Sequence, residues 1–285
     1  MLQESALPVE YLVPADAAEA AAMKAAGALV LAGGTDVYPA HVGRSFAGPV
    51  ADITGLADLK GLEVTDRSYR FGALTRWAEI AAADLPPRFD GLRAAAREIG
   101  GIQVQNAGTI AGNLCTASPA ADGVPNLLAL DASVELASPT GRRVLAVEDF
   151  LTGYRSTELG DDEIVTAVEV PRTDEDARAS FVKLGLRRYL VISVVMVAAI
   201  VALDDEARVR DARLAVGACS PVARRLRTLE ADLRGHRADE LSFIVTPEHL
   251  ADLTPIDDVR ATAAYRLRAA VTLVRRALDR CGEPR

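Results

Sequence analysis

The sequence has few residues of the kinds that build metal centres or disulfide frameworks. Its 285 residues include three cysteines and three histidines. Cys115, Cys219 and Cys281 lie far apart and form no CxxC or Cys/His spacing, so they predict neither a zinc site nor an iron–sulfur cluster. The histidines are equally scattered. We therefore expect reduced thiols in a cytoplasmic protein.

Long apolar runs and an excess of basic residues are also missing. The most apolar stretch, residues 191–203, is shorter than the ~20 residues of a membrane helix and predicts a buried strand. The first residues, MLQESALPVEYLVP, lack a basic region followed by an apolar core, so they predict no signal peptide. A net charge of -8 disfavours nucleic acids and anionic membranes as partners, because both would repel the chain. Small molecules and other proteins are the expected partners.

Half of the residues are hydrophobic, which is enough for one large domain or two ordinary ones. The polar stretch PRTDEDARAS predicts a boundary, with domains at 1–176 and 177–285. In the first domain the patterns predict a helix over 17–26 that ends at Gly27, a strand directly after it, and a hairpin over 62–74. The second domain reads as a meander of antiparallel strands followed by helices near 221–234 and 257–281. Thr75 is expected to cap the helix that follows it. The fold class is α+β.

An expected strand at residues 28–34 ends in paired glycines, followed by Thr35 and Asp36. Glycine has no Cβ, so the backbone can approach a ligand, and successive N–H groups in such a turn form a nest for a phosphate. Asp36 has the wrong charge to face a phosphate, so its side chain is expected to cap the turn or to bind a hydroxyl. A tight turn without a ligand would use the same glycine pair.

A second segment, residues 103–122, is rich in glycine, hydroxyl and amide groups and is expected to be a long functional loop. Its TIAGN sequence repeats the chemistry of the first turn, and Thr116, Ser118 and Asp122 follow. Two such segments suit a diphosphate that bridges them. No GxGxxG motif occurs near a strand-to-helix turn, which disfavours a Rossmann nicotinamide domain.

These motifs carry a resemblance that covers nearly the whole chain. VLAGGTDVYP, GTIAGNLCTASPAADGVPNLLALDA, FVKLGLRR, ISVVMVAAI and the last helix resemble the FAD-binding medium subunit of molybdenum hydroxylases, the xanthine dehydrogenase and carbon monoxide dehydrogenase medium chain family. The resemblance implies a p-cresol methylhydroxylase-type FAD-binding domain of two α/β subdomains. It also implies a C-terminal domain with an antiparallel three-stranded sheet and a helical bundle.

The resemblance further implies a set of cofactor-binding residues. The first turn would wrap around the FAD pyrophosphate, and the second segment would contact the diphosphate and ribityl or ribose groups. An aliphatic residue and a lysine would lie near the flavin ring. The residues are Leu31, Ala32, Gly33, Gly34, Thr35, Asp36, Val37, Thr109, Gly112, Asn113, Ser118, Asp122, Ile164 (or Val165) and Lys183. Lys183 is expected to tune the flavin by stabilising its anionic reduced form.

Four positions differ from the family pattern. Ile99 stands where some relatives carry an aromatic residue over the flavin, and Ala111 replaces the first of two paired glycines. Cys115 stands at a position that is commonly aliphatic and is interpreted as a buried small residue rather than a redox group. Tyr189 stands at a position that is often acidic, and a packed core tyrosine is favoured over one that lies on the flavin.

The resemblance implies an electron-transfer subunit of an oxidoreductase. Electrons would come from [2Fe-2S] centres on a small partner subunit, after hydroxylation at a large molybdopterin-bearing subunit, and would pass from FAD to a soluble acceptor. Two alternatives stay open: a self-contained FAD oxidoreductase of the same superfamily, and a scaffold subunit without FAD. The sequence identifies neither the hydroxylated substrate nor the electron acceptor.

Overall fold

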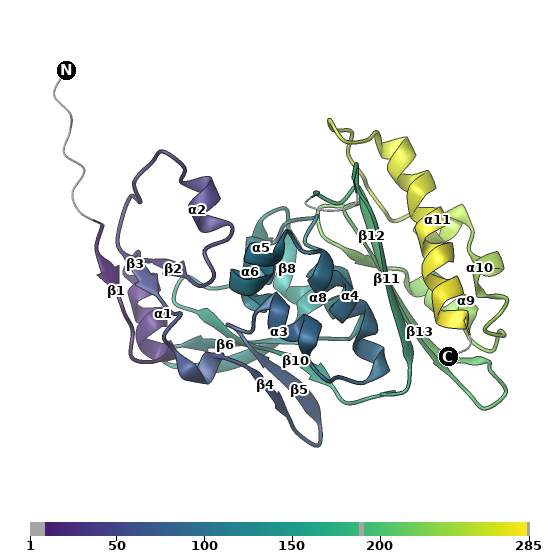
Figure 1. Ribbon diagram of the computed structural model, residues 1–285, viewed down its shortest axis with the longest axis horizontal. Helices are drawn as coiled ribbons and strands as arrows, with labels where there is room; N and C mark the ends of the chain where they lie inside the picture. Colours follow the sequence, from purple (N-terminus) through teal and green to yellow (C-terminus); the bar gives the residue numbers. More distant parts are fainter. Residues whose placement is uncertain (1–8, 188–190, 284–285) are drawn as a thin grey trace.

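The computed structural model describes residues 9–187 and 191–283, so Tyr189 lies outside the described residues. Figure 1 shows a row of three regions: a small sheet with α1 and α2, a central sheet with helices, and a C-terminal sheet covered by α11. The apolar residues form two cores, one beneath the first two regions and one beneath the C-terminal helices.

The first sheet is parallel and has the strand order β1-β3-β2. Asp16 begins α1, where its carboxylate accepts a hydrogen bond from the Glu19 N–H at 2.8 Å, as helix N-caps do. The chain then passes through Gly27 into β2, so the expected helix and strand are both confirmed. The glycine turn follows β2 directly. The elements are β1 (Tyr11–Leu12), α1 (Ala17–Ala25), β2 (Leu29–Leu31), α2 (Val37–Ala40) and β3 (Val50–Asp52).

The second sheet is antiparallel, with the strand order β4-β5-β10-β6-β7. The expected cap at Thr75 is wrong: its hydroxyl donates to the carbonyl of Gly61 at 2.8 Å, and Arg76 is the residue that begins α3. The strands are β4 (Leu62–Val64), β5 (Ser68–Gly72), β6 (Ser133–Ser138), β7 (Gly141–Ala146) and β10 (Ile164–Pro171).

Short helices cover this sheet, and two of them lie in the segment that was expected to be a loop. That expectation is wrong because Ile110 and Leu114, which are fully buried and four residues apart, give α6 an apolar face. Most of the surrounding residues are small or polar, so the helical spacing of the apolar residues is not evident in the sequence. The elements are α3 (Trp77–Ala82), α4 (Asp90–Glu98), α5 (Ile102–Ala107), α6 (Ile110–Thr116), α7 (Gly123–Ala129), α8 (Val147–Phe150), β8 (Leu151–Gly153) and β9 (Ser156–Thr157).

The C-terminal sheet has four antiparallel strands, so the expectation of three is wrong. The fourth, β14, has two residues that pair with Ala215 and Val216 of β13, and it occupies the start of the helix expected at 221–234. So short a strand leaves no alternating pattern to detect. The strands are β11 (Arg178–Leu184), β12 (Val195–Leu203), β13 (Val209–Gly217) and β14 (Arg224–Arg225).

Strand β12 belongs to both cores. Met196, Ala198 and Ile200 pack in the core of the first two regions, whereas Val197 and Ala199 pack beneath the C-terminal helices. Burial on both faces accounts for the unbroken apolar run in its sequence. The first two regions and the C-terminal region therefore pack against opposite faces of the same strand.

The C-terminal helices cover the outer face of this sheet (Figure 1). The last helix begins later than expected, at Ala263, where the Thr262 hydroxyl accepts a hydrogen bond from the Tyr265 N–H. No helix of the described residues is long and apolar enough to cross a membrane. The helices are α9 (Arg227–Leu233), α10 (Leu241–Ile244) and α11 (Ala263–Gly282).

Candidate functional site

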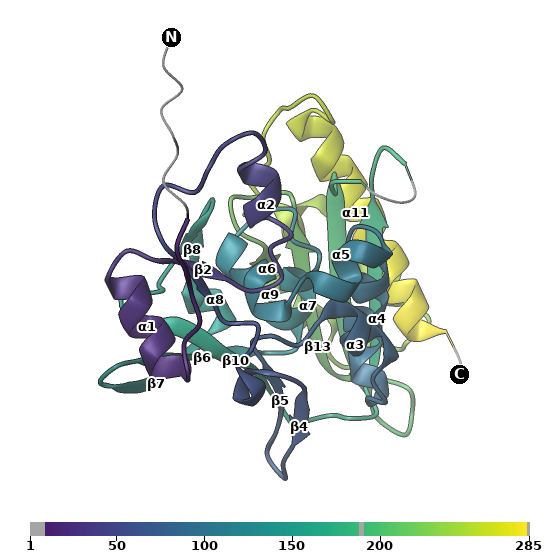
Figure 2. The ribbon, with the colours of Figure 1, turned by 60° about the vertical axis from the view of Figure 1, so that its left-hand side comes forward.

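A cavity of about 570 Å³ lies between the glycine turn after β2 and the helices α5 and α6. Figure 2 shows the chain leaving β2 toward α2, with α6 nearby. The volume is in the range of pockets that hold cofactors, and a second cavity of about 450 Å³ shares Ala32, Gly33 and Thr109 with it. The cavity brings together nine of the expected cofactor-binding residues: Ala32, Gly33, Gly34, Thr35, Asp36, Val37, Thr109, Gly112 and Asn113.

The turn at residues 33–36 has the features of an anion site. A Cβ at Gly33 would lie 1.9 Å from the carbonyl oxygen of Ala107, and Gly34 has a φ of +68°, so both positions require glycine. Among the described residues, no other group accepts a hydrogen bond from the four N–H groups of this turn. Unpaired successive N–H groups beside a cavity suit a phosphate.

The start of α6 differs, because the protein itself uses most of its N–H groups. The N–H of Ile110 donates to Thr75 at 3.0 Å, and the N–H of Gly112 donates to the Thr109 hydroxyl at 3.1 Å. The Oδ1 atom of Asn113 is buried and has no hydrogen-bond partner among the described residues. An unpaired buried acceptor on a cavity wall suits a ligand hydroxyl. Together the two loops fit a ligand that carries both a diphosphate and hydroxyl groups, as FAD does.

Asp36 does not cap its turn, so the first of its two expected roles is wrong, while the binding of a hydroxyl stays a prediction. It begins α2 without a side-chain cap, and its Oδ2 accepts a hydrogen bond from Nη1 of Arg155 at 3.1 Å. Arg155 lies in the turn between β8 and β9 and also lines the cavity. Sequence reasoning missed this arginine because its partner is 119 residues away and no motif surrounds it.

Cys115 also lines the cavity, and its side chain is exposed there, so the expectation of a buried residue is wrong. The surrounding protein desolvates the thiol and raises its pKa to about 11, even though the cavity leaves it accessible. The thiol is therefore protonated at neutral pH, and the absence of a redox role stays a prediction. Ile99 lies on the same wall, together with two apolar residues that were not predicted, Trp77 and Val104.

Asp122 and Lys183 are brought together, but away from the cavity wall. Nζ of Lys183 lies 2.5 Å from Oδ2 of Asp122, with side chains 6% and 7% exposed, and Ser193 donates to the other carboxylate oxygen at 2.5 Å. Burial raises the pKa of Asp122, whereas Lys183 and Ser193 favour the charged form. The pair connects the start of α7 with β11, and so the two parts of the chain.

Three other expected residues also lie away from the cavity wall. Leu31 and Ile164 are buried in β2 and β10, with exposures of 4% and 3%. The Ser118 hydroxyl accepts a hydrogen bond from the N–H of Ala120 at 3.3 Å.

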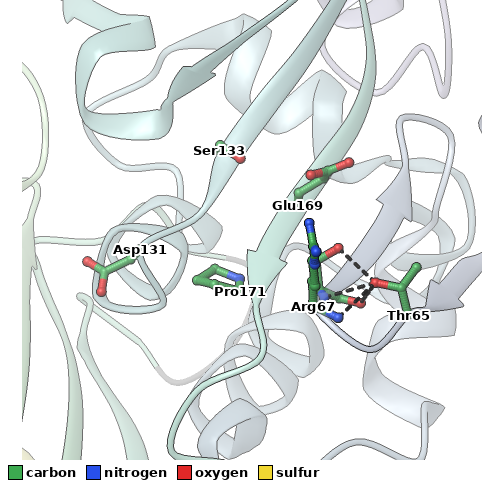
Figure 3. A pocket seen from close by; sticks show the side chains of 7 residues that line it. Thr65, Arg67, Asp131, Ser133, Glu169 and Pro171 are labelled. Carbon is green, nitrogen blue, oxygen red and sulfur yellow. Dashed lines mark hydrogen bonds between the residues drawn. The ribbon is translucent and has the colours of Figure 1, made fainter.

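A separate cavity of about 530 Å³ lies at the β4–β5 hairpin and the ends of β6 and β10 (Figure 3). It contains none of the expected residues, and the Thr65 hydroxyl is used within the hairpin, where it accepts from the N–H groups of Arg67 and Ser68. The described residues also contain no group of three or more His, Cys, Asp or Glu side chains that could hold a metal ion. The cavity beside the glycine turn is therefore the candidate site.

Comparison with known families agrees with this geometry. Residues 7–173 match the FAD binding domain in molybdopterin dehydrogenase, and residues 180–281 match the CO dehydrogenase flavoprotein C-terminal domain. The chain belongs to the FAD-binding medium-subunit family of the molybdopterin hydroxylases. The resemblance, the α+β fold and the assignment as an oxidoreductase subunit of the xanthine dehydrogenase family are thereby confirmed.

Individual members of the medium-subunit family are similar over most of the chain. The xanthine dehydrogenase FAD-binding subunit of Escherichia coli O157:H7 is 30% identical over 257 residues, which cover 88% of each chain. The nicotinate dehydrogenase FAD-subunit of Eubacterium barkeri is 36% identical over 182 residues, or 62% of this chain and 61% of that one. A structure of carbon monoxide dehydrogenase from Hydrogenophaga pseudoflava superposes with a TM-score of 0.87 at 26% identity, over 96% of this chain and 97% of that one.

Proposed function

We propose that this chain binds FAD in the cavity beside the glycine turn and is the electron-transfer flavoprotein of a molybdenum hydroxylase complex. The observation that carries the proposal is the run of unpaired N–H groups at residues 33–36, which faces a cavity in an FAD-binding domain. The two sheets of this domain, one parallel and one antiparallel, support a fold of the p-cresol methylhydroxylase type.

The residues of the cavity have complementary roles in this proposal. The N–H groups of residues 33–36 bind the diphosphate, and the Asn113 side chain accepts a hydrogen bond from a ribityl or ribose hydroxyl. Ile99 and Val104 exclude water from one wall. Bound FAD supplies a carrier that can hold one or two electrons. The protein holds the cofactor and leaves its chemistry to the flavin.

Lys183 is proposed to stabilise the anionic reduced flavin by its positive charge. Its ion pair with Asp122 holds the side chain in one place and partly neutralises it. A Lys183→Met variant is expected to have a lower flavin midpoint potential than the wild type, measured by redox titration of the flavin-loaded protein. An unchanged potential would contradict this role.

The electrons are proposed to come from other subunits. Three distant cysteines cannot supply the four thiolates of a [2Fe-2S] centre. A small iron–sulfur subunit and a large molybdenum subunit would therefore donate the electrons, as the family membership suggests, and a soluble acceptor would remove them. The names of the relatives, which act on xanthine, nicotinate or carbon monoxide, differ too much to suggest a substrate.

The residues that line the cavity give little support to the alternative of a self-contained oxidoreductase. Such an enzyme needs an acid or base beside the flavin. The cavity wall carries Asp36, which is paired with Arg155, and Cys115, whose pKa is about 11. A scaffold without FAD is also less well supported, because Ala111 lies within α6, where the helical backbone does not require glycine.

Two measurements test the proposed function. The purified chain, incubated with FAD and separated from free cofactor, is expected to retain the visible absorbance of flavin. A chain that retains none would favour the scaffold. The complex purified from the native source should contain iron and molybdenum, and its reducing substrate should be oxidised only when the partner chains are present. Oxidation of that substrate by this chain alone would overturn the electron-transfer role.

A further inference from the structure

Arg155 connects the two loops of the candidate site. Its N–H donates to the carbonyl of Ala117, just after α6, at 3.0 Å, and its side chain donates to Asp36 in the glycine turn at 3.1 Å. The side chain is half exposed and lines the cavity. The β8–β9 turn therefore carries a cation to the place where the two loops meet.

The charged side chains that line the cavity favour a ligand-binding role for Arg155. Among the described residues that line the cavity, Arg155 is the one Lys or Arg side chain and Asp36 is the one carboxylate. A diphosphate bound to the glycine turn would meet the negative charge of Asp36 at close range. A guanidinium has five N–H donors in a planar fork, so Arg155 can contact Asp36 through Nη1 and still bind a phosphate.

The backbone at this position also favours a role for the side chain. Arg155 has a φ of +50°, a left-handed conformation in which glycine or asparagine is the usual residue. An arginine at this position therefore carries local backbone strain. Strain of this kind is common at ligand sites.

We propose that Arg155 binds the diphosphate of FAD and that Asp36 is the residue that positions it. The inference rests on the proposed function, because it places FAD in this cavity. The guanidinium bridges the Asp36 carboxylate and the phosphate oxygens, so that the carboxylate orients the arginine while the arginine neutralises the carboxylate. The site then combines backbone N–H groups on one side of the diphosphate with a side-chain cation on the other.

The test is the FAD affinity of the apo chain, measured by titration of flavin fluorescence. Arg155→Gln is expected to weaken FAD binding by about 10- to 100-fold, the usual effect of losing a hydrogen bond to a charged group. Arg227→Gln is the matched control, because Arg227 is an exposed arginine that pairs with exposed Glu148 at 2.5 Å on another part of the surface. The control should bind FAD as the wild type does, and Arg155→Lys, which keeps the charge, should lose less than Arg155→Gln.

Two further comparisons separate diphosphate binding from other effects of Arg155. Riboflavin lacks the diphosphate, so Arg155→Gln should leave its affinity unchanged; an equal loss for riboflavin and FAD would overturn the proposal. In an Asp36→Asn background, Arg155→Gln should still weaken FAD binding. If the loss disappears there, Arg155 only neutralises Asp36, and the proposal is wrong.

The failure of this inference can be distinguished from failure of the proposed function. If the wild type binds FAD and Arg155→Gln binds it equally well, the role of Arg155 is wrong while the flavoprotein assignment stands. If the wild type binds no FAD, the proposed function itself is wrong.

Discussion

Asp122 was predicted to contact the diphosphate, ribityl or ribose groups of FAD and Lys183 to lie near the flavin ring, and the structure brings the two side chains together. A carboxylate and an ammonium group buried at 2.5 Å depend on one another, because each would otherwise be an uncompensated charge. No sequence pattern could have revealed this, since the two residues are 61 positions apart. The pair, with the hydrogen bond from Ser193 to the same carboxylate, is a buried polar connection between the two parts of the chain.

Removal of Lys183 should destabilise the protein. Lys183→Met leaves Asp122 buried without its cation, and we expect the free energy of unfolding at pH 7 to fall by about 3 kcal/mol. Burial already raises the pKa of Asp122, and without Lys183 the folded-state pKa should stay above that of the unfolded chain. The loss in free energy of unfolding should therefore grow as the pH rises above the ordinary range of a carboxyl group, and it should shrink in acid, where the group is protonated in both states. Urea unfolding at several pH values measures this. Asp122→Asn combined with Lys183→Met should recover part of the stability, and a double variant as unstable as the single one would contradict the explanation.

Gly33 is predicted to be the residue in the glycine turn that least tolerates a side chain. The Cβ of Gly33→Ala would lie 1.9 Å from the Ala107 carbonyl oxygen, so the turn must move away from α5. We expect a loss of about 1–3 kcal/mol in stability together with loss of FAD binding, measured by urea unfolding and flavin fluorescence. Gly55→Ala is the control, since a Cβ there meets nothing within 4 Å and the backbone has no positive φ. Normal FAD binding by Gly33→Ala would show that the turn does not bind the diphosphate.

At the scale of elements, the beginning of α11 depends on a buried arginine. Arg266, 2% exposed, donates to Asp258 at 2.8 Å and to the carbonyl of Val194 before β12 at 2.6 Å. Partial burial acts to raise the pKa of Asp258, but the N–H groups of Arg260 and Ala261 and the nearby guanidinium groups outweigh it and hold the pKa at about 2. The Arg266 guanidinium thus fixes the helix to the sheet, and the Asp258 carboxylate holds that guanidinium in place.

Asp258 should therefore contribute stability that disappears in acid. A folded-state pKa lowered from 3.8 to about 2 means that the contribution is present above about pH 4 and is lost as pH falls toward 2. Asp258→Asn should lower the free energy of unfolding at pH 7 by about 1–2 kcal/mol, after allowance for solvent screening. Denaturant unfolding at pH 7 and at pH 3 should show a smaller difference between variant and wild type in acid. Asp252→Asn, an exposed carboxyl nearby, is the control, and a difference that grows in acid would contradict the prediction.

The elements that the sequence predicted best are those with long periodic patterns. The α1–β2 unit, the β4–β5 hairpin and the strands of the meander were all confirmed. Helices α5 and α6 were missed because their apolar faces consist of very few large residues among glycines and amides. Strand β14 was missed because two residues carry no period.

The candidate site was predictable where one short segment makes it and not where the fold assembles it. The glycine turn lies within four consecutive residues, and its composition alone indicated an anion site. Arg155 and the exposed face of Cys115 come from positions whose neighbours are set by tertiary packing. Such neighbours cannot be deduced from local spacing.

At the scale of the whole molecule, cofactor binding should stabilise the folded chain. A ligand that binds only the folded state adds RT ln(1 + [L]/Kd) to its stability, about 2.7 kcal/mol at a concentration of 100 Kd. FAD should therefore raise the Tm of the apo chain in a concentration-dependent way, measured by thermal unfolding. Adenosine, which lacks both the diphosphate and the flavin, is the control and should leave Tm unchanged. A Tm that does not respond to saturating FAD would mean that the folded chain does not bind it preferentially.

Strand β12 gives alternate side chains to two cores, and this bears on how such a chain can be inherited. A gene break between the two matched regions would leave Met196, Ala198 and Ile200 facing water on one fragment. The same break would remove the sheet from beneath α4 and α7 on the other. Recombination that exchanges one half for a distant counterpart would therefore have to exchange matching packing surfaces as well, so the two halves are expected to evolve as a single heritable unit.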